Sequence, residues 1–295
     1  MIATILGDII GIPYEKHPVR NRKPNFSPLF HPEYSRCTDD TVLTLAVASA
    51  ILKKRANDIP YQEEVLSFAR KYNHAGYGGR FKQWFNSSDP QPYNSFANGG
   101  SMRVGPVGWA FETIEEVLDE AKKSAEITHN HPEGIKGAQA IALAVFLARK
   151  GKSKNEIKDE IKTRFGYHLD LSLQEIITTF TKNKAKTLKL DTSAAGTVPQ
   201  AIVAFLESTD VESAIRIAVS LGGDADTLAA MAGSIAEAFY QNDQKSVAGL
   251  LAMVKEMKKM RTEYGPYLDN FLLHTTISFY EKYIPDSPVI ALLKT

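Results

Sequence analysis

Cysteine is almost absent from this sequence of 295 residues, in which Cys37 is the single example. One cysteine cannot form an internal disulfide, and such sparing use is typical of a reducing compartment, so we expect a cytoplasmic protein. Cys37 adjoins a cluster of carboxylates and could therefore be a nucleophile. A lone cysteine is more often a small buried side chain, and we favour that interpretation.

A surplus of either charge is also missing. Lys and Arg number 35 against 34 for Asp and Glu, which leaves a formal net charge of +1. A balanced chain has no general attraction to nucleic acid or to an anionic membrane, so we expect neither as a bulk partner. The longest apolar run, Ile141 to Ala148, is too short to cross a bilayer. The residues after Met1 lack basic side chains and soon reach Asp8, which does not fit a secretory signal.

Strand signals are few, and no linker rich in Pro, Gly or Ser divides the chain. Apolar residues instead recur at helical spacing, and hydrophobic residues make up 43% of the chain, enough for a sizeable core. We therefore expect one compact all-α domain over residues 1–295, present as a monomer. The clearest helices are expected at 2–10, 60–73, 113–126, 135–149, 153–165, 196–206, 210–221, 246–260 and 268–283.

Proline and glycine define several expected boundaries. Gly11 and Pro13 should end the first helix and leave Glu15 in a turn, whereas Pro199 should lie in the first turn of its helix. The polar residues 17–32 predict an irregular loop, and 171–190 predict a helix with a ragged connector.

Two acidic clusters each precede an apolar run. We call Thr38-Asp39-Asp40-Thr41 the first acidic knot and Gly222-Gly223-Asp224-Ala225-Asp226-Thr227 the second acidic knot. Each predicts the start of a buried helix, because Thr and Asp side chains accept hydrogen bonds from the free N–H groups of a first helical turn.

The second Asp of each knot leaves two interpretations open. Both knots could be helix caps only, but one Asp is enough for that purpose. A carboxylate at the entrance of an apolar helix is costly to desolvate without a positive neighbour, and neither knot contains Lys or Arg. A cation shared by the two knots would supply the charge, and ligands made only of oxygen suit Mg²⁺, Mn²⁺ or Ca²⁺ rather than zinc.

Three further features could belong to a site. Asp8 lies on or beside the apolar face of the first helix. The paired glycines in Asn98-Gly99-Gly100-Ser101-Met102-Arg103 could let backbone N–H groups approach a phosphate, or they could form a tight turn. In Thr128-His129-Asn130-His131, the two histidines suggest zinc, but a histidine at a helix entrance is more often a hydrogen-bonding cap.

Taken together, these residues resemble the ADP-ribosylglycohydrolase family, which includes the dinitrogenase-reductase-activating glycohydrolases of bacteria and the ADP-ribosyl-hydrolases of animals. The likeness extends from Gly7 to Tyr240 and rests on five pieces in the family's order. These are Gly7-Asp8-x-x-Gly11 with Glu15, Thr38–Thr41, Asn98–Arg103, Thr128-His129 and Gly222–Thr227.

The resemblance implies an orthogonal helical fold with two divalent ions, Mg²⁺ or Mn²⁺, in a cleft at helix ends. By its motifs the catalytic carboxylates would be Glu15 and Asp40. The metal ligands would be Thr38, Asp39, Asp40, Asp224, Asp226 and Thr227. The residues along the substrate would be Asn98, Gly99, Gly100, Ser101, Met102 and His129, with the nearby His131 leaving open which ring faces the cleft.

The reaction implied by the resemblance is hydrolysis of the bond between the distal ribose of ADP-ribose and an acceptor, with release of ADP-ribose. The acceptor could be a protein side chain, a nucleic-acid base or a small molecule. Two alternatives stay open. A silent relative would keep the fold as a binding or structural protein after losing the knots, and a metal-dependent phosphohydrolase would release phosphate or AMP instead.

Overall fold

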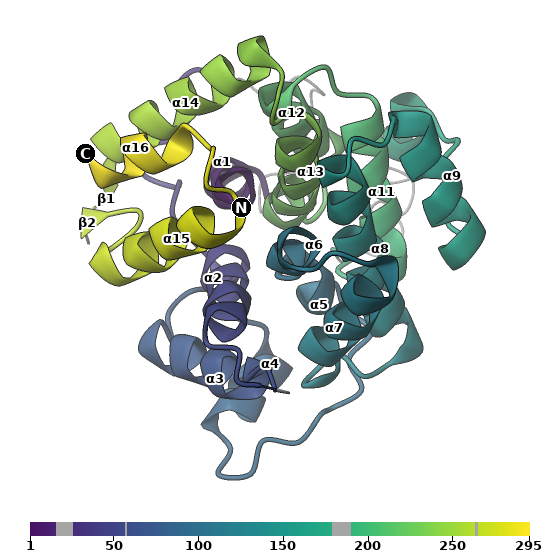
Figure 1. Ribbon diagram of the computed structural model, residues 1–295, viewed down its shortest axis with the longest axis vertical. Coiled ribbons are helices and arrows are strands. Elements are labelled where there is room, and N and C mark those ends of the chain that lie inside the picture. Colours follow the sequence, from purple (N-terminus) through teal and green to yellow (C-terminus); the bar gives the residue numbers. More distant parts are fainter. Residues whose placement is uncertain (16–25, 57, 179–189, 263–264) are drawn as a thin grey trace.

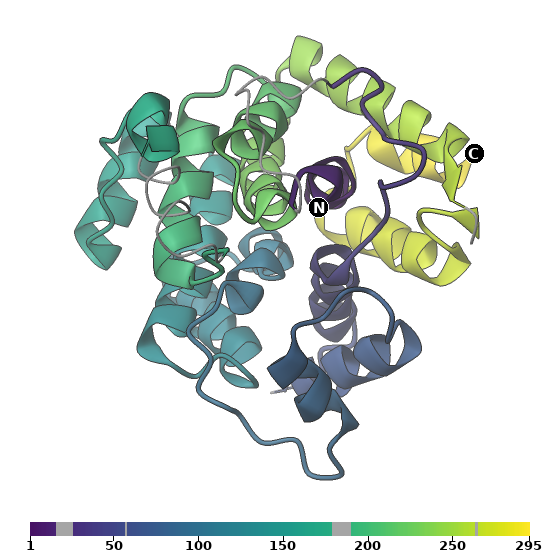
Figure 2. The same ribbon diagram turned by 180° about the vertical axis from the view of Figure 1, so that it is seen from behind.

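The computed structural model describes residues 1–15, 26–56, 58–178, 190–262 and 265–295, and it is built of packed helices (Figures 1 and 2). The first part of the chain forms α1 (Ile2–Glu15), α2 (Asp39–Leu52), α3 (Tyr61–Lys71), α4 (Gly79–Asn86), α5 (Gly99–Met102), α6 (Gly105–Ala110), α7 (Ile114–Glu126), α8 (Pro132–Arg149) and α9 (Lys154–Phe165). After a helical stretch at 173–178 come α11 (Ala194–Leu206), α12 (Val211–Leu221), α13 (Ala225–Phe239), α14 (Gln244–Lys259), α15 (Asn270–Tyr283) and α16 (Val289–Lys294).

Strands make a minor contribution to this fold. Within the described ranges they are β1 (Arg261–Thr262) and β2 (Gly265–Pro266), which form one short antiparallel pair. The all-α class expected from the sequence is confirmed. No helix of the described ranges has both the length and the apolar character that a membrane span requires.

Local capping chemistry sets most of the helix starts. Thr113 and Ser153 each form a capping box with the Glu three residues later, and Asp210 forms one with Ser213. These starts agree with the sequence, since the capping residues and the apolar periodicity are both local signals.

Two expectations about proline were wrong. α1 continues through Pro13 to Glu15, so Glu15 is the last residue of a helix rather than part of a turn. Pro13 lies near the helix end and removes only one donor there, while burial of the apolar face through Ile12 favours the longer helix. α11 begins at Ala194 with Ser193 as its cap, which places Pro199 in the second turn.

The helix α4 was not expected, because its segment is dense in glycine and asparagine and has no long apolar period. Aromatic packing stabilises it instead. The ring of Tyr77 lies 5.2 Å from Phe81 and 5.3 Å from Phe85, measured between ring centroids, and Trp84 packs on Phe81.

The centre of the fold is the pair α1 and α13, which pack along each other and are surrounded by α2, α8, α11 and α12 (Figure 1). The C-terminal helices α14, α15 and α16, to which the sequence assigned no function, cover one side of this centre. The hydroxyl of Tyr280 on α15 accepts a 3.0 Å hydrogen bond from the backbone N–H of Ile2 at the start of α1. These helices therefore help to fix α1.

The expected loop at 17–32 and the expected connector at 171–190 fall partly outside the described residues, at 16–25 and 179–189.

Candidate active site

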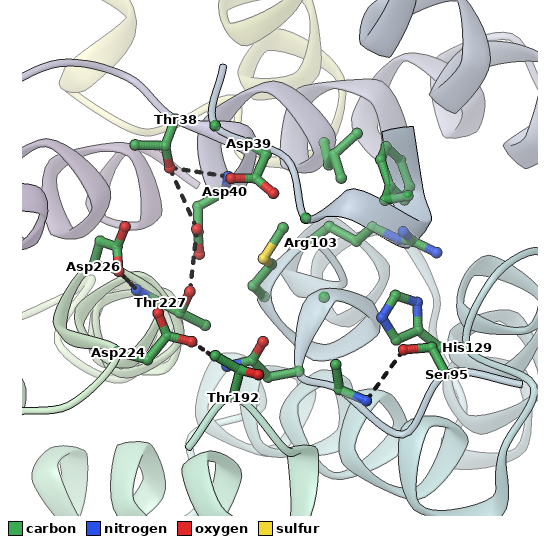
Figure 3. Close-up of a pocket in the computed structure, with 18 of the residues that line it drawn as sticks. Thr38, Asp39, Asp40, Ser95, Arg103, His129, Thr192, Asp224, Asp226 and Thr227 are labelled. Carbon is green, nitrogen blue, oxygen red and sulfur yellow. Dashed lines mark hydrogen bonds between the residues drawn. The ribbon is translucent and has the colours of Figure 1, made fainter. Parts of the chain in front are cut away.

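The two acidic knots lie at the starts of α2 and α13, and the fold brings these helix ends together (Figure 3). Thr227 Oγ1 in the second acidic knot donates a 3.2 Å hydrogen bond to Asp40 Oδ2 in the first. Asp40, Asp224 and Asp226 are all buried. Two clusters that are far apart in the sequence thus form one cluster in the structure.

Two glycines of α1 explain why a third helix reaches this cluster. A Cβ atom on Gly7 would lie 2.3 Å from the carbonyl oxygen of Ala229, and one on Gly11 would lie 2.5 Å from the Cα of Asp226. Only glycine permits α1 to pack this closely against the first turns of α13. Asp8, which follows Gly7, is carried to the same point.

Asp8 connects α1 to the first acidic knot through hydrogen bonds. Its carboxylate accepts hydrogen bonds from the backbone N–H groups of Thr38 and Thr41, at 2.9 and 3.1 Å. It also accepts from the hydroxyls of the same two residues, at 2.7 and 2.5 Å. The conformation of the first acidic knot therefore depends on a residue that lies thirty positions earlier.

Asp8, Asp40 and Asp226 form a buried acidic triad, in which one carboxylate oxygen from each residue lies within 4.8 Å of the other two. From the sequence, Asp8 is expected on or beside an apolar face but is not among the candidate ligands. The available signal was a carboxylate between two glycines on an otherwise apolar helix.

We expect the substitution Asp8→Asn to destabilise the protein by on the order of 2 kcal/mol or more. An amide has only one acceptor oxygen, and its NH₂ group would face N–H and O–H donors. Thermal unfolding measures the effect, with Asp119→Asn on the exposed face of α7 as the matched control. Equal melting temperatures for the two variants would contradict this account of Asp8.

The capping interpretation explains only part of the cluster. Thr38 is the N-cap of α2 and accepts from Asp40 N, as expected. Asp224 occupies the N-cap position of α13 but makes no capping hydrogen bond, and its Oδ2 accepts at 2.6 Å from Asn98 Nδ2. Asp40 Oδ1 is buried without a hydrogen-bond partner in the described part of the chain. These oxygens are surplus to capping.

Burial and mutual repulsion raise the pKa values of the clustered carboxyls. Desolvation is the largest cause for Asp40, followed by the charges of Asp226 and Asp8, and the pKa rises well above its usual range. Desolvation and the charge of Asp224 raise the pKa of Asp226 well above its usual range. The pKa of Asp39 is raised to about 7, mainly by desolvation and Asp8. The pKa of Asp224 is raised by desolvation to about 6, against the hydrogen bond from Asn98.

The donor set fits a divalent cation. Every candidate ligand is an oxygen atom, one buried carboxylate oxygen is unpartnered, and no positive charge of the described chain is among the main causes that shift the pKa values of these carboxyls. A cation would remove the cause of both the desolvation cost and the repulsion. The acidic triad could therefore hold a metal ion.

We expect the stability of the metal-free protein to fall as the pH rises from about 6.5 to 8. Carboxyls with pKa values raised by folding hold more protons in the folded than in the unfolded state, so raising the pH through this interval lowers the free energy of unfolding. Each unit of pKa shift is worth about 1.4 kcal/mol per group. The window starts at 6.5 because burial lowers the pKa of His129, which has the opposite effect below that pH. Burial also lowers the pKa of the Met1 amino group, which opposes the decline within the window, but this is one group against several carboxyls.

Melting temperatures in EDTA at several pH values test this expectation, with Asp226→Asn as the comparison. The variant should show a shallower decline, and added Mg²⁺ should stabilise the wild type more at pH 8 than at pH 6.5, since the ion competes with protons. Wild-type stability that rises with pH in EDTA would contradict the assignment of these pKa values.

The acidic cluster borders one side of a cavity of about 500 Å³. Figure 3 shows the two knots facing each other there, with Arg103 and His129 at the opposite side. Tyr93 packs near His129 and under Arg80, so both residues belong to this second side, whereas Arg36 borders the cavity two residues before the first acidic knot. The cavity is therefore acidic at one end and cationic and aromatic at the other.

Most of the predicted site residues border this cavity. They are Glu15, Thr38, Asp39, Asp40, Asn98, Gly99, Met102, His129, Asp224, Asp226 and Thr227. Gly100 and Ser101 lie behind the wall instead. A Cβ atom on Gly100 would lie 3.3 Å from the Cβ atoms of Ala125 and His129, and Ser101 is fully buried with its Oγ facing Gly137 of α8. The structure also brings Arg80 and Tyr93 to the cavity, and neither residue belongs to a motif that predicted a site.

The two histidines of the 128–131 segment have separate positions. His131 is the N-cap of α8, and its Nδ1 accepts from Glu133 N at 3.1 Å. His129 is buried at the cavity wall, and its Cε1 and Nε2 atoms lie over Gly99. His129 is therefore the ring that faces the cleft.

Cys37 does not have the environment of a nucleophile. Its Sγ contacts the carbonyl oxygen of Tyr267 at 3.1 Å, and burial raises the pKa of the thiol well above its usual range. The neutral thiol is thus the favoured form, in agreement with a structural cysteine.

Comparison with known proteins identifies the family. The family model described as ADP-ribosylglycohydrolase matches residues 1–245. The chain is 28% identical over 312 residues to human ADP-ribosylhydrolase ARH3, covering 83% of this chain and 85% of that protein. It is 27% identical over 286 residues to the uncharacterized protein YegU of Escherichia coli, covering 80% and 84%.

A solved structure described as an ADP-ribosylglycohydrolase-related protein complex has a TM-score of 0.60 to this fold at 24% identity. The match covers 85% of this chain and 92% of that chain. The fold and the extent of the family match agree with each other, and the chain belongs to the ADP-ribosylglycohydrolase family.

Proposed function

We propose that this chain is a metal-dependent hydrolase that cleaves the bond between the distal ribose of ADP-ribose and an acceptor group. The observation that carries the proposal is the polarity of the cavity. Its acidic end holds buried carboxylates that form no ion pair with Lys or Arg in the described chain, and its other end holds Arg80 and Arg103 beside His129. A ligand with hydroxyl groups at one end and a diphosphate further along matches this distribution.

The residues that would hold the cations are Thr38, Asp39, Asp40, Asp224, Asp226 and Thr227. Asp8 would orient Thr38 and Thr41, because its carboxylate oxygens already accept four hydrogen bonds from them. A bound Mg²⁺ or Mn²⁺ would supply Lewis acidity toward the oxygen atoms around it.

The protein's own side chains would handle the protons. Cleavage moves the electron pair of the C1 bond to the acceptor atom, which gains a proton, while a water oxygen bonds to C1 and loses one. Glu15 borders the cavity at the end of α1, and its charge raises the pKa of Asp224 and Asp226, so it lies close to the reacting end. We assign Glu15 as the main proton carrier and Asp40 as a second carboxylate at the reacting end.

The silent-relative alternative is less well supported, because both acidic knots are intact and meet in space. The phosphohydrolase alternative would use the same carboxylates on a different bond. Product identity separates the three functions.

A panel of substrates tests the proposal. Peptides with ADP-ribose on arginine or serine, an ADP-ribosylated oligonucleotide and an ADP-ribosylated small molecule are incubated with the protein and Mg²⁺, and products are measured by mass spectrometry. Intact ADP-ribose from at least one substrate supports the proposal and identifies the acceptor. AMP or phosphate would indicate the phosphohydrolase, and binding without any product would indicate the silent relative.

A further inference from the structure

Arg103 is a positively charged side chain buried inside the protein, with hydrogen bonds to only part of its guanidinium. It is fully buried, its guanidinium is always charged, and neither Nε nor Nη1 has a hydrogen-bond partner in the described residues. Nη2 donates to the carbonyl oxygen of Ser124 at 2.8 Å and to Thr128 Oγ1 at 3.0 Å. Arg103 therefore holds the last turn of α7 and the hydroxyl of Thr128 together.

Thr128 Oγ1 also contacts the ring of the next residue, His129. It lies 2.7 Å from His129 Nδ1 and 3.5 Å from the carbonyl oxygen of Ala125. A guanidinium has only donors, so the hydroxyl oxygen accepts from Arg103 and has one hydrogen left to give. The much shorter contact favours donation to His129 Nδ1, which makes Nδ1 an acceptor.

A ring whose Nδ1 accepts a hydrogen bond carries its hydrogen on Nε2 when it is neutral. The Nε2 edge of His129 lies at the cavity wall over Gly99, where a Cβ atom would come within 3.0 Å of Nε2. The absence of a side chain at Gly99 thus leaves the Nε2 edge uncovered on that side.

We propose that Arg103 and Thr128 are positioning residues that hold His129 as a neutral ring with its hydrogen on Nε2, which donates to an acceptor oxygen of bound ADP-ribose. The ligand contact rests on the proposed function, whereas the state of the ring does not. Arg103, which borders the cavity, attracts the anionic ligand, and His129 supplies a directed hydrogen bond.

The surroundings of His129 favour the neutral form. The titratable or charged side chains that face it in the described chain are Arg103, Arg80 and Tyr93, and the neighbouring Gly99, Gly100 and Gly134 contribute none. Burial is the largest cause that lowers the pKa of His129, and the charges of Arg103 and Arg80 add to it. The donor on Nε2 should therefore persist from about pH 6.5 to 8, above the ordinary pKa of a histidine.

The first test is the ring state in the ligand-free protein. Proton–nitrogen NMR correlations on protein labelled with ¹⁵N-histidine distinguish the two neutral tautomers and the cation, and loss of one signal set in His129→Gln identifies His129 among the 7 histidines. Wild type and Thr128→Ser should show the Nε2–H tautomer throughout this pH range. Thr128→Val removes the hydroxyl at nearly constant volume, and it should shift His129 toward a mixture of tautomers.

The second test is the dissociation constant for ADP-ribose measured by calorimetry. Thr128→Ser should bind within about twofold of wild type, and Thr128→Val should bind about tenfold more weakly. A merely structural Thr128 would change the melting temperature without changing the tautomer.

Several results would overturn the proposal. A wild-type ring that is cationic at pH 7 or carries its hydrogen on Nδ1 would do so, and so would an unchanged tautomer in Thr128→Val. Wild type that fails to bind ADP-ribose would instead refute the proposed function and the ligand contact, while the NMR result would still decide the state of the ring.

Discussion

Asp40→Asn and Asp226→Asn should each lower the release of ADP-ribose by at least about 100-fold while leaving the metal-free protein no less stable than wild type. The reason is electrostatic. Both carboxyls are buried beside other carboxyls, and their pKa values are raised by desolvation and by the charges of neighbouring carboxylates. An amide of the same shape relieves that repulsion but is a poor ligand for a divalent cation.

Three measurements on the same two variants separate the interpretations of the knots. These are the melting temperature in EDTA, its increase with Mg²⁺, and the rate of product release. The increase in melting temperature with Mg²⁺ should disappear when the Asp ligand is replaced, since an ion stabilises only the state that binds it. Asp119→Asn, on the exposed face of α7, should behave as wild type in all three.

If the knots were helix caps only, the outcome would be different. Asn caps a helix about as well as Asp, so both variants would be nearly silent in every assay. Near-wild-type turnover in Asp40→Asn and Asp226→Asn would therefore end the metal-centre interpretation.

Glu15→Gln should lower turnover by about 10² to 10⁴ with little change in the affinity for ADP-ribose. Glutamine preserves the size and the hydrogen-bonding oxygen of the side chain but cannot carry a proton between water and the leaving group. Glu15 makes no ion pair with Lys or Arg in the described chain and is half-buried at the end of α1, so the substitution should leave folding intact.

Single-turnover kinetics measure the rate of the reaction, and titration with ADP-ribose measures the affinity. Glu63→Gln, on the exposed side of α3, is the matched control. A Glu15→Gln enzyme with a normal single-turnover rate would remove Glu15 from the reaction. Weakened binding with a normal rate would make it a binding residue only.

The sequence predicted the two knots because their signals are local. A cap residue, a carboxylate and an apolar run lie within a few positions of one another, and each knot does begin a buried helix, at Asp39 and Ala225. Their meeting depends on tertiary contacts, which the family resemblance implied but local spacing could not show.

Asp8 illustrates what local patterns cannot show. Its position beside the knots depends on the close approach of α1 to α13 at Gly7 and Gly11, and the residues it meets on α13 are more than two hundred positions away. A single sequence indicates a carboxylate on an apolar face but not its partner. The four donors that Asp8 meets become visible only in the folded chain.

The cationic end of the cavity was missed for a different reason. Arg80 lies on α4, in a segment whose glycine and asparagine content favours a loop. The helix exists because the rings of Tyr77, Phe81 and Phe85 pack together, and such side-chain packing is not visible as a period in the sequence. Ser101 shows the converse, since a motif residue assigned to the substrate is buried against α8.

The most direct test of the account is a crystal structure grown with Mn²⁺ and analysed by anomalous scattering. We expect anomalous density where the two acidic knots meet, within about 2.0–2.6 Å of carboxylate oxygens of Asp39, Asp40, Asp224 and Asp226. Water alone among these four side chains at a saturating concentration of Mn²⁺ would contradict the central claim that the knots form a metal centre.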